Sequence, residues 1–178
     1  MSAYRRLYIW VEGPDDERFF QDIVSPRFTS RYDQIIIRRY AGLTPDKVGD
    51  FLRNIKAMND DYLFVADVDN SPCITSKKAT LTARYKYLEV ANIIVVKAEI
   101  ESWYHAGLEQ EVCTRLRLKH LTNTEPLTKE KFQAARPHRF SSGIDFMIEV
   151  LDHFNSETAC SQNASLAYFF GKYGLRDA

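Results

Sequence analysis

Short hydrophobic runs alternate with amphipathic segments over the first hundred residues of the chain. The runs predict buried strands because they are short, rich in Ile, Val and aromatic residues, and bounded by polar or Gly-Pro positions. They cover residues 7–11, 34–38, 62–68 and 92–96. Between them, hydrophobic residues recur at helical spacing over residues 15–24, 45–58 and 75–88. This alternation predicts a mostly parallel sheet with right-handed crossovers.

The pattern changes after Ile100, where helical periodicity continues without a further strand-like run. We expect helices over residues 103–118, 128–135, 143–154 and 164–173. No Gly/Ser-rich linker or internal repeat separates the two parts. The sequence therefore predicts an α/β fold. Residues 1–107 form a mostly parallel central sheet of about four strands flanked by helices, and residues 108–178 form a C-terminal helical extension packed on the same domain.

Composition adds few constraints to this picture. The 178 residues are 45% hydrophobic, which suits one globular domain with a sizeable core. Lys plus Arg number 24 and Asp plus Glu number 24, so the net charge indicates no overall basic field for nucleic acid. If several carboxylates bind divalent ions, however, the remaining surface is more basic than this count suggests.

The cysteines and the hydrophobic run lengths indicate a cytoplasmic protein. Cys73, Cys113 and Cys160 lie far apart without a Cys-x-x-Cys pair, which is typical of reduced thiols. The N-terminal apolar run is too short for a signal peptide, and no stretch approaches the roughly 18 apolar residues of a membrane span. We therefore expect no membrane association.

Acidic residues stand at the end of three predicted strands. Glu12 follows the first, Asp67 and Asp69 end the third, and Glu99 and Glu101 follow the fourth. Ligands of open α/β sheets bind at the carboxyl edge, where these side chains are expected to meet. Residues two apart leave a strand on the same face, so each acidic pair can share one ion if the strand persists. Oxygen ligands without His or Cys favour Mg²⁺ or Mn²⁺.

Each acidic position also has a purely structural explanation. Carboxylates are favoured in a first helical turn, which we prefer for Asp15 and Glu17. Residues 67–72 have the composition of a polar turn, and Glu99 or Glu101 can cap the following helix. The occurrence of acidic residues at three strand ends together favours a ligand-binding site, because clustered carboxylates repel one another unless a ligand compensates their charge.

The acidic motifs together resemble a known domain family. Val11-Glu12-Gly13 with Asp16, then Asp67-x-Asp69, then Glu99-x-Glu101-x-Trp103 is similar to the TOPRIM domain, the metal-binding module of topoisomerases, bacterial primases, recombination mediators and overcoming-lysogenization-defect (OLD) nucleases. The opening resembles most the stand-alone TOPRIM-like proteins and the nuclease domain of the OLD group. The resemblance covers Tyr8 to about Gly107.

The resemblance implies roles for individual residues. Glu12 matches a metal ligand or general acid/base, Asp67 and Asp69 match the metal-binding pair, Asp16 matches an additional ligand, and Glu101 with Glu99 matches the late carboxylate. The implied reaction is attack of metal-activated water on a phosphodiester. Near the fourth strand, Lys97 is a candidate electrostatic stabiliser of the transition state, or simply a solvated lysine.

The sequence also departs from the family. No G-x-x-x-x-G-K-[ST] phosphate loop is present, so the ATPase half of OLD nucleases is missing from this sequence. The expected partner is therefore a separate ATPase or another protein subunit. There is no room for the tyrosine-bearing domain of a topoisomerase or the further regions of a primase. We expect nucleic acid, DNA rather than RNA, to contact basic residues that follow the core. The alternative explanation of these residues is that they form a solvated helix face. These are Arg115, Arg117, Lys119, Arg136 and Arg139.

Three functional hypotheses follow. The first is a Mg²⁺- or Mn²⁺-dependent nuclease, in a multicomponent DNA-processing or phage-defence system by family inference. The second is a non-catalytic TOPRIM-like module that binds nucleic acid or a partner. The third is a phosphatase or receiver-like domain, which the helical C-terminal part disfavours. The near-complete acidic set favours catalysis.

Overall fold

The fold is built on a four-stranded parallel sheet, described here from a computed structural model covering residues 4–176. The predicted α/β class is confirmed. The strand order is β2-β1-β3-β4, with β1 paired in parallel to both β2 and β3. The strands are β1 (Arg6–Val11), β2 (Gln34–Arg39), β3 (Asp61–Asp67) and β4 (Ile93–Val96), each within about one residue of its prediction.

The strand register aligns side chains across the sheet. Trp10 of β1 lies opposite Arg38 of β2 and Phe64 of β3. Cross-strand partners point to the same face, so these three side chains form one row. Strand β2 is at the edge of the sheet and its isoleucines are only half-buried, whereas all four residues of β4 are buried.

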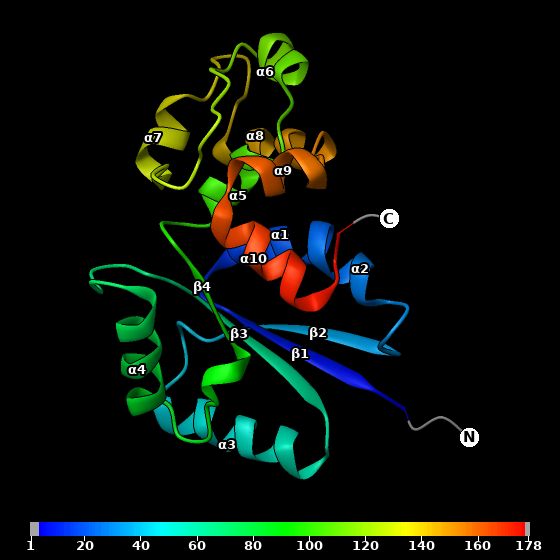
Figure 1. The fold of residues 1–178 in the computed structure, drawn as a ribbon, viewed down its shortest axis with the longest axis vertical. Helices are drawn as coiled ribbons and strands as arrows, with labels where there is room; N and C mark the ends of the chain where they lie inside the picture. The colour runs from blue at the N-terminus through cyan, green and yellow to red at the C-terminus, as the bar shows by residue number, and fades with distance from the viewer. Residues whose placement is uncertain (1–3, 177–178) are drawn as a thin grey trace. The chain divides into compact units, whose positions relative to one another are not determined.

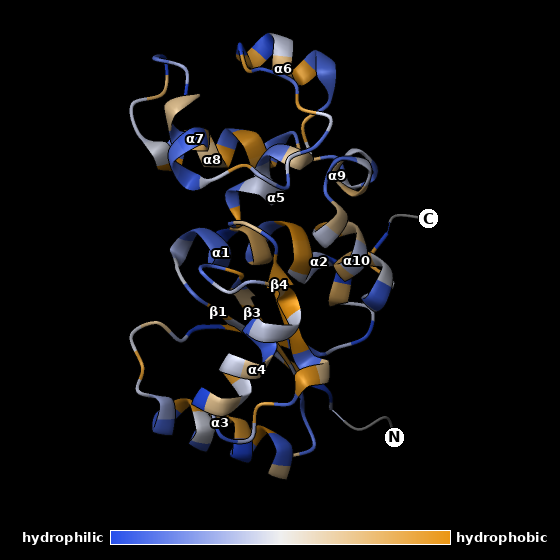
Figure 2. Ribbon diagram, turned by 60° about the vertical axis from the view of Figure 1, so that its left-hand side comes forward, coloured by the Kyte–Doolittle hydropathy of each residue, from blue (hydrophilic) through white to orange (hydrophobic). Residues whose placement is uncertain are grey.

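Helices cover both faces of the sheet. Figure 1 shows α3 (Pro45–Ala57) and α4 (Ile74–Arg84) on one face and α1 (Pro14–Phe19) with α2 (Ser25–Phe28) on the other. The core on the α3 side includes Trp10 and Phe64 from the strands and Leu52 from α3. In Figure 2, α3 alternates between hydrophobic and hydrophilic residues, as expected of a helix with one buried face, while β4 is hydrophobic throughout.

The first helical segment is longer than predicted. The pattern predicts one helix over residues 15–24, but α1 continues through a π-helical turn, η1 (Phe20–Val24), into α2. Pro14 occupies the first turn, where its missing N–H costs nothing. Phe19, Phe20 and Val24 are fully buried, so the apolar side of this segment packs inward as its spacing indicates.

Two other predicted boundaries change. Helix α4 ends at Arg84 rather than at residue 88, because Tyr85 adopts extended backbone geometry. A single turn of 3-10 helix, η2 (Val90–Asn92), leads into β4. Tyr85 is buried and contacts Phe64 with ring centroids 5.3 Å apart. Tertiary packing of this ring therefore overrides the helical periodicity of residues 85–88.

The chain forms two compact units, residues 1–95 and residues 96–178. The sheet and its helices make up the first unit. The second unit is helical and includes α5, because the boundary lies after residue 95. The predicted core, in contrast, extends to residue 107. That residues 108–178 pack on the core stays a prediction. The second unit contains α5 (Glu101–Ala106), α6 (Gln110–Leu116), α7 (Lys129–Ala134), α8 (Gly143–Asp152), α9 (Ser156–Gln162) and α10 (Ala164–Tyr173).

One predicted helix, over residues 103–118, is wrong because the chain breaks at Gly107. Helix α5 ends there and α6 starts three residues later. A Cβ at position 107 would lie 2.2 Å from the ring of Phe154, so glycine permits this close approach. The carbonyl of Gly107 accepts a hydrogen bond from the N–H of Asn155 at 2.9 Å. The hydrophobic periodicity continues across this break and conceals it.

Helix α9 was not predicted. Its N-cap Asn155 accepts a hydrogen bond from the N–H of Thr158 at 2.9 Å, and this Asn-x-x-Thr spacing is the local signal for the helix start. Aromatic rings make much of the core of the second unit. Trp103 stacks on Phe169 at 5.6 Å, and Phe132 stacks on Phe146 at 4.9 Å.

The described residues contain no helix long and apolar enough to cross a membrane. No disulfide joins Cys73, Cys113 and Cys160 to one another, as predicted. Cys113 is buried, and burial raises the pKa of its thiol. Cys73 instead caps α4, where its Sγ accepts from the N–H of Ser76 at 3.4 Å.

Candidate functional site

Acidic residues of the first unit lie at the carboxyl edge of the sheet. Glu12 directly follows β1, and Asp67 is the last residue of the neighbouring strand β3. Tyr40 directly follows β2 on the other side of β1, and its N–H donates to the carbonyl of Val11 at 3.0 Å. Three adjacent strand ends thus contribute two carboxylates and a phenol to one edge.

Tyr40 connects these strand ends. Its ring stacks on Phe64 with centroids 4.4 Å apart, which directs the hydroxyl toward the carboxyl edge. The hydroxyl lies 3.0 Å from the carbonyl oxygen of Val65 and 3.5 Å from Oε2 of Glu12. A phenol has one proton to donate, so it bonds one of these two acceptors at a time.

The electrostatics of Tyr40 show which carboxylates gather there. Burial is the main cause that raises the pKa of Tyr40, and the negative charges of Glu12, Asp16 and Asp67 raise it further. These charges disfavour a phenolate. Three predicted metal ligands therefore act on a single hydroxyl, which identifies an acidic cluster, defined here as Glu12, Asp16 and Asp67.

Asp16 is the most buried member of the acidic cluster, at 7% exposed. One of its oxygens, Oδ2, accepts a hydrogen bond from the N–H of Gly13 at 3.1 Å. This contact caps the start of α1 and holds the Asp16 carboxylate against the backbone of Gly13, the residue after Glu12. The structural and functional explanations of Asp16 are therefore compatible.

Asp69 departs from its predicted geometry. Strand β3 ends at Asp67, and Asp69 has φ 49°, in the left-handed region. The expectation that Asp67 and Asp69 leave a continuing strand on the same face is wrong for this reason. The carboxylate of Asp69 forms a short ion pair with Nζ of Lys77, a buried lysine of α4.

Glu99 and Glu101 likewise do not continue a strand. Strand β4 ends at Val96, and Glu101 is the first residue of α5, so their predicted strand geometry is wrong. Both carboxylates contact Lys129: Glu99 accepts from its backbone N–H, and Oε1 of Glu101 lies 3.5 Å from its Nζ. Glu101 is 1% exposed, so it is a buried carboxylate whose cationic partner is exposed.

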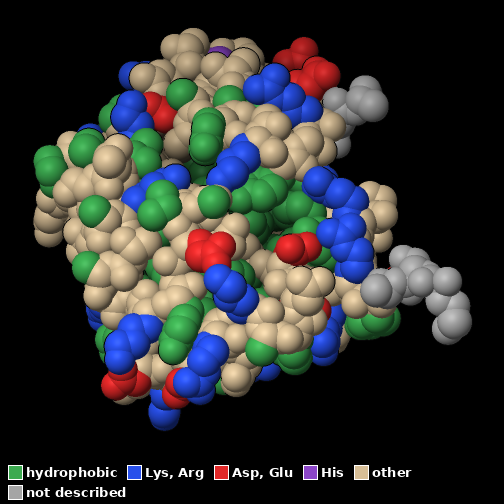
Figure 3. Space-filling view, turned by 60° about the horizontal axis from the view of Figure 1, so that its bottom comes forward, with side chains coloured by type: hydrophobic (Ala, Val, Ile, Leu, Met, Phe, Trp, Pro, Cys, Tyr) green, Lys and Arg blue, Asp and Glu red, His purple; other side chains and the backbone are tan. Residues whose placement is uncertain are grey.

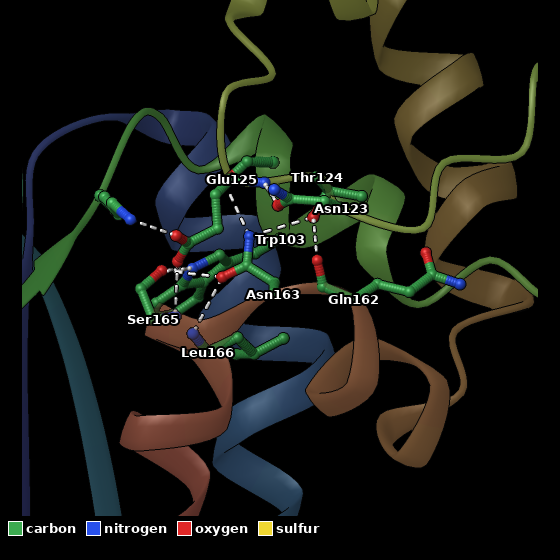
Figure 4. A network of polar contacts seen from close by, with 10 residues as sticks. Trp103, Asn123, Thr124, Glu125, Gln162, Asn163, Ser165 and Leu166 are labelled. Carbon is green, nitrogen blue, oxygen red and sulfur yellow. Dashed lines mark hydrogen bonds and ion pairs between the residues drawn. The ribbon is translucent and has the colours of Figure 1, made fainter.

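Lys97 is engaged in an ion pair. Its Nζ lies 2.6 Å from Oε2 of Glu125. The other oxygen of Glu125 accepts from the N–H of Ser165 at 2.9 Å, in the network drawn in Figure 4. At the centre of this network, buried Asn163 donates to Thr124 Oγ1 at 3.0 Å and accepts from the N–H of Leu166 at 3.0 Å. These contacts give Lys97 a structural role within the second unit.

The predicted nucleic-acid contacts are distributed over several elements of the second unit. Arg115 lies 3.1 Å from Nε2 of His153, and Arg117 ends α6 with φ 58°. Arg139 lies over the ring of Phe140 at 4.7 Å and pairs with Glu149 at 3.9 Å. Lys119 is exposed and Arg136 is half-buried.

A metal site made only of protein ligands is not formed in residues 4–176, since no three His, Cys, Asp or Glu side chains are grouped to hold an ion. Mg²⁺ does not require such a group, because it usually keeps several waters and binds one or two carboxylates plus substrate oxygens. The acidic cluster, with oxygen donors only and no adjacent His or Cys ligand, fits an ion held in that way.

No family model and no curated protein matches the chain. One solved structure is similar, the C-terminal region of the Burkholderia pseudomallei OLD protein, at 14% identity. The match covers 98% of this chain and 96% of that one with a TM-score of 0.37. The likeness is too remote to contribute to the functional argument below.

Sequence reasoning missed two residues of this edge. Tyr40 is the first residue after the second strand, so its position at the carboxyl edge follows the same rule that selected Glu12. A tyrosine carries no charge at neutral pH, so a pattern of acidic strand ends does not include it. Lys77 gave no comparable signal, because its pairing with Asp69 depends on the left-handed turn between β3 and α4.

Proposed function

We propose that this protein hydrolyses phosphodiester bonds in nucleic acid with the aid of Mg²⁺ or Mn²⁺ bound at the acidic cluster. The observation that supports this most is the contact of the Tyr40 hydroxyl with Glu12, to which Asp16 and Asp67 add negative charge that raises the pKa of that hydroxyl. Clustered carboxylates at the carboxyl edge of a parallel sheet are costly without a cation, so the arrangement favours an ion as ligand.

Each residue of the acidic cluster has a chemical role in this proposal. Glu12 and Asp67 are the candidate ligands from adjacent strand ends, and Asp16 adds negative charge beside them. A bound Mg²⁺ supplies a water of lowered pKa and stabilises charge on the phosphate oxygens. Tyr40 is a positioning residue, since its hydroxyl contacts Oε2 of Glu12, one of these ligands.

The other predicted site residues take less direct parts. Asp69 pairs with Lys77 and Lys97 pairs with Glu125, so we leave both out of the proposed chemistry. Glu99 and Glu101 contact Lys129 within the second unit, so we leave them out of the proposed ion site as well. The proposed substrate is DNA rather than RNA, and this DNA contacts the basic residues of the second unit. A separate ATPase subunit is a proposed partner.

A second candidate function is a non-catalytic module that binds nucleic acid or a partner protein. It is favoured by the absence of a three-ligand metal group in the described part of the chain. The two candidates differ in one measurable property, because only the first predicts turnover of a phosphodiester in the presence of a divalent ion.

The deciding experiment is cleavage of labelled single-stranded DNA, duplex DNA and RNA with Mg²⁺ or Mn²⁺. The variants are Glu12→Gln and Asp67→Asn, which keep size and remove charge. Asp50→Asn, an exposed carboxylate of α3 paired only locally with Arg53, is the matched control. We expect the wild type and the control to cut and both site variants to lose at least about tenfold in rate, since one lost transition-state contact of about 1.4 kcal/mol is tenfold. Equal cleavage by all four proteins contradicts the proposal.

A further inference from the structure

A hollow lies on the face of the sheet that α3 covers, between that helix and strands β1 and β2. It encloses about 410 Å³, within the roughly 300–1,000 Å³ typical of small-molecule sites. Arg38 of the edge strand β2 contributes to one side of the hollow, and α3 contributes to another. Its lining consists of Tyr8, Trp10, Arg38, Phe51, Asn54, Ile55, Ala57 and Met58.

The walls of the hollow are aromatic and aliphatic. Trp10 forms the buried inner wall, and the ring of Phe51 contacts it with centroids 5.6 Å apart. Phe51 is 42% exposed and Met58 is 46% exposed, so hydrophobic surface remains accessible at the rim. Figure 3 shows one face of the molecule on which hydrophobic side chains lie between basic ones. An apolar ring of a ligand can bury itself against such walls.

The polar groups of the hollow are donors that the fold does not use. Among the described residues, the guanidinium of Arg38 has no acidic partner, and the side chains of Tyr8 and Asn54 form no hydrogen bond. No acidic residue lines the hollow. By contrast, neighbouring Arg39 pairs with Glu17 at 3.2 Å, and Arg6 pairs with Asp60 at 3.0 Å. The hollow therefore favours an anion with a planar apolar body.

The core of the first unit connects the hollow with Glu12 of the acidic cluster. Trp10 lies directly opposite Arg38 and Phe64 in the strand register. Tyr40 stacks on Phe64 in the same core, and its hydroxyl contacts Glu12. Trp10 precedes Glu12 by two residues, which is about 7 Å along a strand. Trp10 is thus the wall residue nearest along the chain to Glu12, while Tyr8 and Met58 extend the hollow toward the amino ends of the strands.

We infer that the hollow binds a nucleotide of the substrate, with the base against Phe51 and Tyr8 and a phosphate at Arg38. This inference rests on the proposed function and names a subsite for it. Arg38 neutralises phosphate charge without a metal, and the aromatic side chains stack on the base. The unused donor of Asn54 and the hydroxyl of Tyr8 bond to base-edge acceptors, which gives this subsite its base preference.

The test measures binding of 5′-mononucleotides to the full chain without divalent ions, in EDTA. Under these conditions the acidic cluster repels phosphate and no cleavage occurs. Tryptophan fluorescence is the readout, because Trp10 lines the hollow and the chain has only two tryptophans. Nucleosides and ribose 5-phosphate separate the contributions of base and phosphate.

Three variants sharpen the result. Arg38→Gln removes the charge and is expected to weaken mononucleotide binding about tenfold while leaving nucleoside binding unchanged, as for the loss of a charge-assisted hydrogen bond. Phe51→Ala is expected to weaken both about tenfold through lost stacking. Arg53→Gln is the matched control, since Arg53 lies on the same helix outside the hollow and should bind as the wild type does. Circular dichroism melts verify that each variant is folded.

The outcomes separate the two proposals. Saturable binding that follows this pattern supports the nucleotide subsite even if the protein cuts no substrate, in which case only the proposed hydrolysis fails. If the wild type shows no saturable signal with any mononucleotide, or if folded Arg38→Gln binds them with wild-type affinity, the subsite is overturned. Cleavage that depends on Glu12 would then leave the proposed hydrolysis intact.

Discussion

The hydroxyl of Tyr40 lies 3.5 Å from Oε2 of Glu12, although 28 residues separate them in the chain. The contact exists because β1 and β2 pair in parallel and end together, so the residues that follow them are neighbours. Tyr40 also contacts the carbonyl of Val65 at 3.0 Å and thereby spans β1 to reach β3. This single side chain brings together the strand ends that carry the acidic cluster.

The raised pKa of Tyr40 predicts a loss of stability in alkali. In the unfolded chain a tyrosine loses its proton near pH about 10, whereas folded Tyr40 keeps its proton above that pH. Above pH 10 the unfolded state therefore binds fewer protons than the native state, and the free energy of unfolding falls as pH rises. In Tyr40→Phe this fall should be shallower, as measured by urea unfolding at a series of alkaline pH values.

At neutral pH the same variant should lose about 1 kcal/mol of stability, the usual net value of a hydrogen bond. Tyr87→Phe is the control, because Tyr87 is 51% exposed. An alkaline slope in Tyr40→Phe identical to that of the wild type would contradict the assignment of the slope to Tyr40.

Asp69 and Asp67 are expected to behave differently although they are two residues apart. The asparagine of Asp69→Asn tolerates the left-handed backbone of this position, so the variant mainly loses the ion pair with Lys77. Because Asp69 is half-exposed, the free energy of unfolding should fall by about 1 kcal/mol or less. The variant should keep the Mn²⁺ affinity of the wild type, while Asp67→Asn should lose it. Isothermal calorimetry with both variants measures this, and equal losses in the two would assign Asp69 to the ion instead.

Gly107→Ala is expected to destabilise the second unit by about 1–3 kcal/mol, the range for overpacking a well-packed position. The added Cβ would lie 2.2 Å from Cδ2 of Phe154, so the ring must move. Thermal unfolding measures the loss. Gly42→Ala provides the comparison, since nothing lies within 4 Å of its added Cβ and its stability should hardly change. A Gly107→Ala protein as stable as the wild type would show that Phe154 does not pack there.

Asn163→Ala should cost about 2 kcal/mol, since it removes the N-cap of α10 and leaves Thr124 without its donor in a buried site. Asn123→Ala is the matched control, because exposed Asn123 makes one local contact to the N–H of Glu125. Chemical denaturation of the two variants gives the difference. Equal stability of both would refute the central place of Asn163 in the network of Figure 4.

Local patterns were sufficient to predict the architecture of the first unit. The strands and α3 follow from hydrophobic spacing, because each buries one face or both faces against the same core. The break at Gly107 was not predictable in this way, since its cause is the ring of Phe154, which belongs to the segment between α8 and α9. The end of α4 at Tyr85 has the same kind of cause, a tertiary ring contact.

The candidate site was predicted in part for a related reason. Glu12 and Asp67 stand at strand ends, and that position follows from the sequence pattern alone. The contact of Asp69 with Lys77 and of Glu99 and Glu101 with Lys129 depends on turns whose backbone geometry the spacing does not determine. Tyr40 depends on the pairing of β1 with β2, which only the assembled sheet reveals.

The most direct test of the acidic cluster as a divalent-ion site is calorimetric titration of Mn²⁺ into the wild type, Glu12→Gln, Asp67→Asn and the control Asp50→Asn. We expect saturable binding to the wild type and the control and at least about tenfold weaker binding to both site variants, because Mg²⁺-type ions depend on one or two carboxylates. Binding of equal affinity to all four proteins, or no binding to the wild type, would contradict an ion site at the acidic cluster.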